Sequence, residues 1–150
     1  MEKDGKTYKF KDENYKTGSF KEWPCPGTRP SKQFGTMVAQ GDVVAMFFGH
    51  DHNNSFEVNY KGIDLVATPG FTFSSYGNEE KGYRVIDLDE NDTSTYETHI
   101  VQWQDYYGSS KMAMNHYNMY AQENSGWVKF TSALKYIPFA LIKVLFGYIF

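Results

Sequence analysis

Two histidines, His50 and His52, stand one residue apart just after an unbroken apolar run over Val43–Phe48. Neutral imidazole is the commonest metal-ligating side chain, so this pair could hold a transition metal. The apolar run ends at Gly49, which predicts a buried central strand carrying both rings to the rim of a sheet. We then expect both imidazoles to point the same way, into a concave site. Because His-x-His is short, the residues alone leave a metal site and a solvated polar loop both open.

The residues that follow the pair come in an ordered pattern. After Gly49–Asn54 the chain reads Lys61-Gly62-Ile63, then a loop rich in glycine and tyrosine, then Gly82–Leu88. In this order the elements resemble the C-terminal part of calcineurin-like metallophosphoesterases, in the branch related to purple acid phosphatases. The resemblance covers about residues 30–104.

This resemblance implies a function for the paired histidines. His50 and His52 would each ligate a different ion of a two-metal site, holding divalent transition metals such as Mn, Fe or Zn. Asn54 would orient the loop through bonds from its side chain to the backbone. The implied reaction is hydrolysis of a phosphate ester, with the metal pair activating water.

The family's other ligand motifs are missing from this chain. They are Asp-x-His, Gly-Asp-x-x-Asp, Gly-Asn-His and a further histidine, all upstream of the pair. No histidine precedes His50, and Ala45 stands where a second acid would have to follow Gly41-Asp42. The resemblance therefore implies a C-terminal fragment that is inactive alone and requires a missing upstream catalytic segment.

A second interpretation is a non-catalytic or cupin-like β-domain that binds a single metal. His50, His52 and Glu57 match the first cupin motif, His-x-His-x4-Glu. Gly62 lies too close to Glu57 for that motif, and no histidine follows Pro69-Gly70 at the required spacing. This interpretation is the weaker one, and Glu57 is expected to face solvent.

Composition sets broader limits. A chain of 150 residues could form one domain. Its net charge of −3 gives no electrostatic case for binding nucleic acid. Cys25 is the sole cysteine, between two prolines, so no intrachain disulfide can form and the cellular compartment stays unknown. No apolar leader follows Met1.

Four other side chains could do chemistry, and a structural role is expected for each. Asp51 lies between the two candidate ligands and could support one of them, but it is expected to be a solvated carboxylate. Arg84 could pair with phosphate, but its place inside a predicted strand favours a salt bridge or a position on a sheet face. His99, on another predicted strand, and His116, near methionines and tyrosines, each lack a neighbouring ligand in the sequence.

Hydrophobic periodicity predicts an α+β fold, and the resemblance implies that this fold is the C-terminal sheet portion of a calcineurin-like α/β/β/α sandwich. A short helix over 32–39 would be capped by Ser31 and end at Gln40-Gly41. About five strands, mostly antiparallel, would follow, with a tight turn at Lys61-Gly62. Their expected ranges are 43–48, 56–60, 63–67, 83–88 and 95–103. Residues 1–32 are expected to be mostly loop, with a possible short strand at 7–10.

Residues 1–104 are assigned to the phosphoesterase-like part, and 105–150 to a linker and an apolar helical tail. A marginal helix is possible over 111–122. The run 136–150 is apolar on all sides, and Pro138 is typical of a first helical turn. This run is shorter than the roughly 20 residues needed to span a bilayer. It could pack into the core, contact a membrane or bind another copy.

Overall fold

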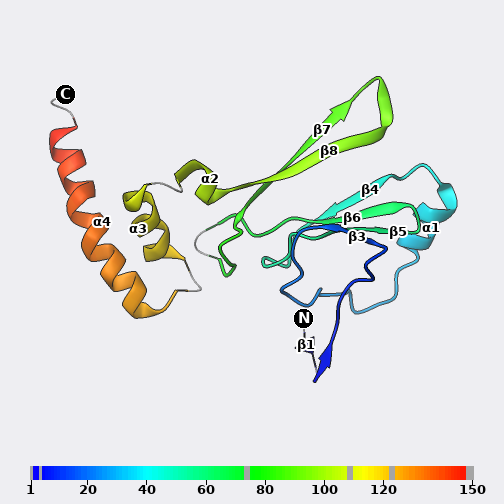
Figure 1. The fold of residues 1–150 in the computed structure, drawn as a ribbon, viewed down its shortest axis with the longest axis horizontal. Coiled ribbons are helices and arrows are strands. Elements are labelled where there is room, and N and C mark those ends of the chain that lie inside the picture. The colour runs from blue at the N-terminus through cyan, green and yellow to red at the C-terminus, as the bar shows by residue number, and fades with distance from the viewer. Residues whose placement is uncertain (1, 4, 73–74, 108–109, 122–123, 148–150) are drawn as a thin grey trace.

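The computed structural model describes residues 2–3, 5–72, 75–107, 110–121 and 124–147 (Figure 1). It is a mixed α+β structure, in agreement with the predicted class. Its strands are β1 Glu2–Lys3, β2 Lys6–Thr7, β3 Tyr15–Thr17, β4 Ala45–Phe48, β5 Glu57–Tyr60, β6 Ile63–Ala67, β7 Gly82–Asp89 and β8 Asp92–Gln102. Its helices are α1 Gln33–Gln40, α2 Trp103–Tyr107, α3 Lys111–Tyr120 and α4 Gly126–Phe146.

The main sheet has four strands in the order β3-β5-β6-β4. The predicted hairpin is confirmed, since β5 and β6 pair antiparallel. Lys61 and Gly62 both have positive φ, +52° and +83°, as a tight turn between twisted strands requires. Phe56, Val58 and Ala67 form a small buried core beside this hairpin, and Phe10 and Phe20 pack against it from the N-terminal segment.

The prediction that residues 43–48 form a buried central strand is wrong. β4 pairs parallel with β6 and is the last strand in the sheet order. Val44, Phe47 and Phe48 are 39%, 37% and 37% exposed. An apolar run indicates that both faces of a strand can be buried. It does not indicate whether a second strand pairs with the other edge, because that strand comes from a distant segment. The described residues place no strand there.

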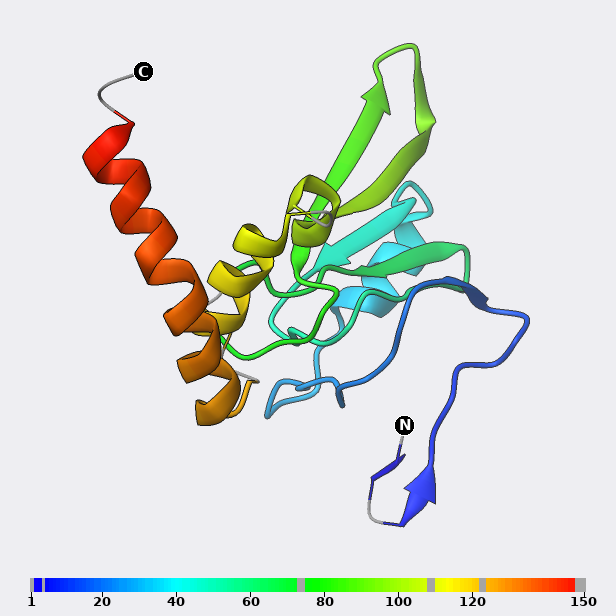
Figure 2. The same cartoon turned by 60° about the vertical axis from the view of Figure 1, so that its left-hand side comes forward.

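A long hairpin, β7–β8, lies beside the sheet (Figures 1 and 2). Arg84 of β7 donates to the Glu57 carboxylate at 2.6 Å and to the Ala67 carbonyl at 2.9 Å. On β8, Tyr96 packs edge-on against Phe47. The predicted salt bridge of Arg84 is confirmed, and it joins the hairpin to β5 and β6.

Helix α1 ends as predicted, because Gly41 takes φ +81° and donates its N–H to the Met37 carbonyl. Its start differs by one residue, with Lys32 in the N-cap position. Ser31 still accepts a hydrogen bond from the Gln33 N–H at 3.1 Å. The sequence therefore predicted the Ser31 side-chain hydrogen bond correctly, but it predicted the start of the helix one residue too early.

Helix α4 begins at Gly126, so the expected start at Pro138 is wrong. Ser125 supplies the N-cap by accepting from the Val128 N–H at 3.3 Å. Pro138 stands inside the helix, which packs along α3. Residues 148–150 of the expected tail lie outside the described residues. None of the described helices is both long enough and apolar enough to cross a membrane.

Candidate metal site

The loop that carries His50 and His52 follows β4 directly. His50 adopts φ +81°, a left-handed conformation uncommon for residues with a side chain and concentrated at ligand sites. Its side chain is 76% exposed, and its Nδ1 lies 3.3 Å from Oδ1 of Asp51. The Asp51 side chain is only 12% exposed, so the expectation of a solvated carboxylate is wrong. Asp51 instead faces the His50 ring.

His52 is held on three sides. Its Nδ1 lies 2.8 Å from the Tyr76 carbonyl and 2.8 Å from Oγ of Ser75. Its ring stacks on that of Tyr76, with centroids 4.3 Å apart and planes 14° apart. A Cβ added to Gly70 would stand 2.8 Å from the His52 Cγ, so the glycine makes room for the ring.

These contacts select one tautomer of His52. A carbonyl oxygen only accepts hydrogen bonds, so Nδ1 carries a hydrogen, and in the neutral form of the ring Nε2 holds the lone pair. Metal-binding histidines commonly donate their second ring N–H to a carbonyl or carboxylate in this way. The His52 environment therefore fits an imidazole prepared to ligate through Nε2.

Asn54 anchors the far end of the loop, as predicted. It is 1% exposed, and its Oδ1 accepts from the backbone N–H groups of Lys21 and Glu22 at 3.0 and 2.9 Å. Its Nδ2 donates to the Glu22 carbonyl at 2.8 Å. One buried amide thus joins the loop to a segment about thirty residues earlier in the chain.

Glu22 braces the same loop, although nothing in the sequence indicated it. Its carboxylate accepts from the Asn53 N–H at 3.1 Å and from the Tyr76 hydroxyl at 2.6 Å. The hydrogen bond to Glu22 is the main cause that raises the pKa of Tyr76, with burial adding to it. Glu22 therefore ties Tyr76, which stacks on His52, to the loop backbone.

Lys81 is a second support that sequence reasoning missed. It is 1% exposed, and its Nζ donates to the Ser75 carbonyl at 2.7 Å. A Cβ on Gly77 would stand 2.4 Å from the Lys81 Cε, so Gly77 allows the lysine to pass. Lys81 therefore fixes the segment that contacts His52. Its position could only be known from the fold, since lysine is rarely buried.

His50 and His52 together supply at most two nitrogen ligands to a metal ion. Within the described part of the chain, no three His, Cys, Asp or Glu side chains gather to hold a metal ion. His99 is exposed on β8, and His116 of α3 stacks on Tyr136 of α4 at 4.6 Å. The assignment of His50 and His52 as metal ligands, and their pointing into one cleft, stay predictions.

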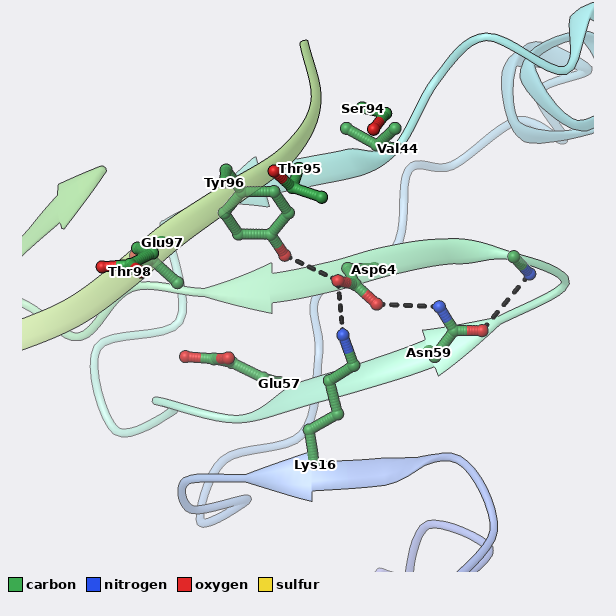
Figure 3. A pocket seen from close by; sticks show the side chains of 11 residues that line it. Lys16, Val44, Glu57, Asn59, Asp64, Ser94, Thr95, Tyr96, Glu97 and Thr98 are labelled. Carbon is green, nitrogen blue, oxygen red and sulfur yellow. Dashed lines mark hydrogen bonds and ion pairs between the residues drawn. The ribbon is translucent and has the colours of Figure 1, made fainter. Parts of the chain in front are cut away.

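A polar hollow of about 660 Å3 lies between β8 and the sheet, away from the loop (Figure 3). At its centre, Asp64 accepts from Lys16 at 2.6 Å, Tyr96 at 2.7 Å and Asn59 at 2.8 Å. Burial acts to raise the pKa of Asp64, but the three hydrogen bonds outweigh it and lower that pKa. These groups satisfy one another and fasten β8 to the sheet.

Glu57 lines the same hollow, and its expected solvent-facing position is wrong. Its side chain is 16% exposed and pairs with Arg84, which is 3% exposed. An ion pair this buried commits the carboxylate to holding β5 against β7. That observation counts against the cupin interpretation, which needs Glu57 as a metal ligand with His50 and His52.

Comparison with curated proteins gives two relatives. The chain is 36% identical over 84 residues to "Probable inactive purple acid phosphatase 29" of Arabidopsis thaliana, which covers 55% of this chain and 22% of that protein. It is 36% identical over 72 residues to "Probable inactive purple acid phosphatase 28" of the same plant, covering 47% and 18%. The chain thus spans about a fifth of the length of these relatives. No family model and no solved structure matches.

These distant relatives are purple acid phosphatase-like proteins, and they support the metallophosphoesterase resemblance found in the sequence. The comparisons therefore support only the broad statement that the chain is related to phosphatases.

Proposed function

We propose that this chain carries the two-histidine segment of a purple-acid-phosphatase-like metal site and does not hydrolyse phosphate esters alone. His50 and His52 would hold divalent transition metals, Mn, Fe or Zn, through Nε2. The observation that carries the proposal is the His52 environment, where the Tyr76 carbonyl takes the Nδ1 hydrogen at 2.8 Å. When bound, a metal pair would activate water and stabilise charge developing on phosphorus.

Different residues of the loop and its surroundings position the two histidine rings. Tyr76 and Gly70 fix the His52 ring, so its Nε2 loses little freedom on binding an ion. His50 is exposed and contacts Asp51 through Nδ1, which leaves its Nε2 outward. Asn54 holds the loop end in the core. The chain would thus present two ligands on a braced loop.

The remaining ligands would come from outside the described residues. The open edge of β4 supports this part of the proposal, because Val44, Phe47 and Phe48 are exposed there. A strand added beside β4 would give it a second neighbour, in keeping with the sandwich that the resemblance implies. Side chains at the end of that strand would then stand near the His50–His52 loop.

The first test is zinc binding by the purified chain, measured by isothermal titration calorimetry. We expect one weak site, lost in His50→Ala and in His52→Ala. The matched control is His99→Ala, an exposed histidine on β8, which should bind zinc as the parent does. Circular dichroism checks that each variant is folded. Unchanged zinc binding in both loop variants, with loss in the control, would overturn the assignment.

The second test is turnover. The purified chain is mixed with an aryl phosphate and with Mn2+, Zn2+ or Fe2+ in turn, and we expect no hydrolysis above the metal-only blank. Two histidine ligands are too few to hold two metal ions, and both ions are needed to stabilise the attacking and the leaving oxygen. Robust hydrolysis that disappears in His50→Ala would show that this chain holds further ligands, and the inactive part of the proposal would be wrong.

A further inference from the structure

The outward face of α4 carries a regular apolar stripe. Its members are spaced alternately three and four residues apart, the repeat by which helices pair in coiled coils. All are large and exposed: Trp127 72%, Phe130 55%, Leu134 60%, Ile137 48%, Leu141 57% and Val144 62%.

Residues 141–146 are exposed on all faces of α4, whereas the N-terminal half of its opposite face is already occupied. It packs along α3, where Ser132 is 4% exposed and Tyr136 stacks on His116. Figures 1 and 2 show α4 as the outermost element on its side, with α3 on one side only. The stripe therefore has no cover from the described residues.

We propose that this stripe binds the same stripe of a second copy of the chain. The exposed parts of the six side chains amount to on the order of 700 Å2 of apolar surface, against roughly 800 Å2 per partner in a stable interface. At 3.6 residues per turn, Lys129, Lys135 and Lys143 fall off the stripe. Like charges therefore do not oppose the pairing of two copies.

Side-chain size selects an antiparallel arrangement. The stripe is bulky at its start and small at its end, from Trp127 to Val144. In a parallel pair the two Trp127 rings would meet, whereas an antiparallel pair sets Trp127 against Val144 and Phe130 against Leu141. Alternating large and small residues fills an interface without voids or strain. Antiparallel helices also oppose their dipoles favourably.

Sedimentation velocity over a range of chain concentrations tests the pairing. We expect a monomer–dimer equilibrium whose dissociation constant rises at least about tenfold in Leu134→Lys. The control is Ile142→Lys, which adds the same charge at an exposed position off the stripe and should leave the equilibrium unchanged. Circular dichroism confirms the helix in both variants. A monomer at every concentration, or equal effects of the two variants, would overturn the proposal.

Cross-linking tests the orientation. Cys25 is exposed and is first changed to Ser. In that background, Trp127→Cys and Val144→Cys chains should form a mixed disulfide when combined and oxidised by air, with O2 taking the two electrons, and much less within either pool. Preferential linkage within the Trp127→Cys pool would refute the antiparallel form. Monomers that instead bind phosphatidylcholine vesicles would assign the stripe to lipid. Both results are independent of zinc binding, so they separate this inference from the metal proposal.

Discussion

Replacing Asn54 by alanine should loosen the candidate metal loop and destabilise the whole chain. The change removes three hydrogen bonds of 2.8–3.0 Å to the backbone of Lys21 and Glu22. It leaves two N–H groups and one carbonyl without their partner, and a buried group left unpaired costs about 1–3 kcal/mol. Lys21 is exposed, so water reaches part of this cluster. We therefore expect a total loss of about 2–3 kcal/mol in the free energy of unfolding.

The measurement is urea unfolding followed by tryptophan fluorescence. Trp23 adjoins the anchored backbone and reports directly on its release. Asn54→Asp should lose at least as much as Asn54→Ala, because it buries a charge and sets a carboxylate oxygen against the Glu22 carbonyl. Asn53→Ala is the matched control, since there the backbone N–H, not the side chain, contacts Glu22.

The same variant links stability to the site. Once the Asn54 anchor is lost, His50 and His52 are held less firmly, and zinc binding should weaken even where the chain remains folded. A stability loss below about 0.5 kcal/mol, the scale of an ordinary surface change, would refute the buried-anchor reasoning. So would equal losses in Asn54→Ala and Asn53→Ala.

Three further changes test other contacts. Arg84→Met should cost about 3–5 kcal/mol by leaving the Glu57 carboxylate buried and unpaired, and adding Glu57→Leu should restore most of it in urea unfolding. The pKa of Asp64 is lowered in the fold, so its contribution is present above its unfolded pKa of about 4 and is lost as pH falls through the folded pKa. Thermal stability measured against pH should thus fall less steeply below about pH 4 in Asp64→Asn than in the parent. Gly70→Ala should displace the His52 ring and weaken zinc binding about tenfold, with the fold intact by circular dichroism.

Local signals were enough to predict several elements. The Lys61-Gly62 turn, the antiparallel pair on either side of it and the Gly41 helix end each depend on residues adjacent in sequence. Alternation of apolar and polar residues indicated β5, and the turn residues set its register with β6. The structural bonds of Asn54 were expected from the resemblance, and the salt bridge of Arg84 from its place in a strand.

Edges and boundaries were harder to predict for a physical reason. An apolar run such as Val43–Phe48 indicates what a strand can bury, but its place in a sheet depends on distant segments. The same limit applies to Pro138, which permits a first helical turn without requiring one. Ser125 caps the helix earlier, and the helix packs against α3 and continues past the proline.

The candidate site shows the limit most clearly. His50 and His52 were found because their residue type and spacing have a chemical meaning on their own. Glu22, Tyr76 and Lys81 support them from segments up to about thirty residues away, and each residue type occurs commonly on surfaces. Their role arises only when the chain folds, because an isolated carboxylate, phenol or lysine carries no signal of what it will contact.

The open β4 edge connects these observations. The outer edge of β4 has unpaired backbone N–H and C=O groups. Because β4 is short, few such groups are exposed, but they remain a template for pairing with a further strand. The loop of His50 and His52 leaves that strand at Gly49, so any segment that pairs with β4 would end beside the loop. Under the proposed function, a ligand-bearing strand added there would cover the free β4 ladder and bring further ligands beside His50 and His52. Protection from hydrogen exchange should be low in the chain alone for the alternate β4 amides that point away from β6, and it should rise when such a segment binds. Full protection of these amides in a monomeric chain would show that the edge is already covered.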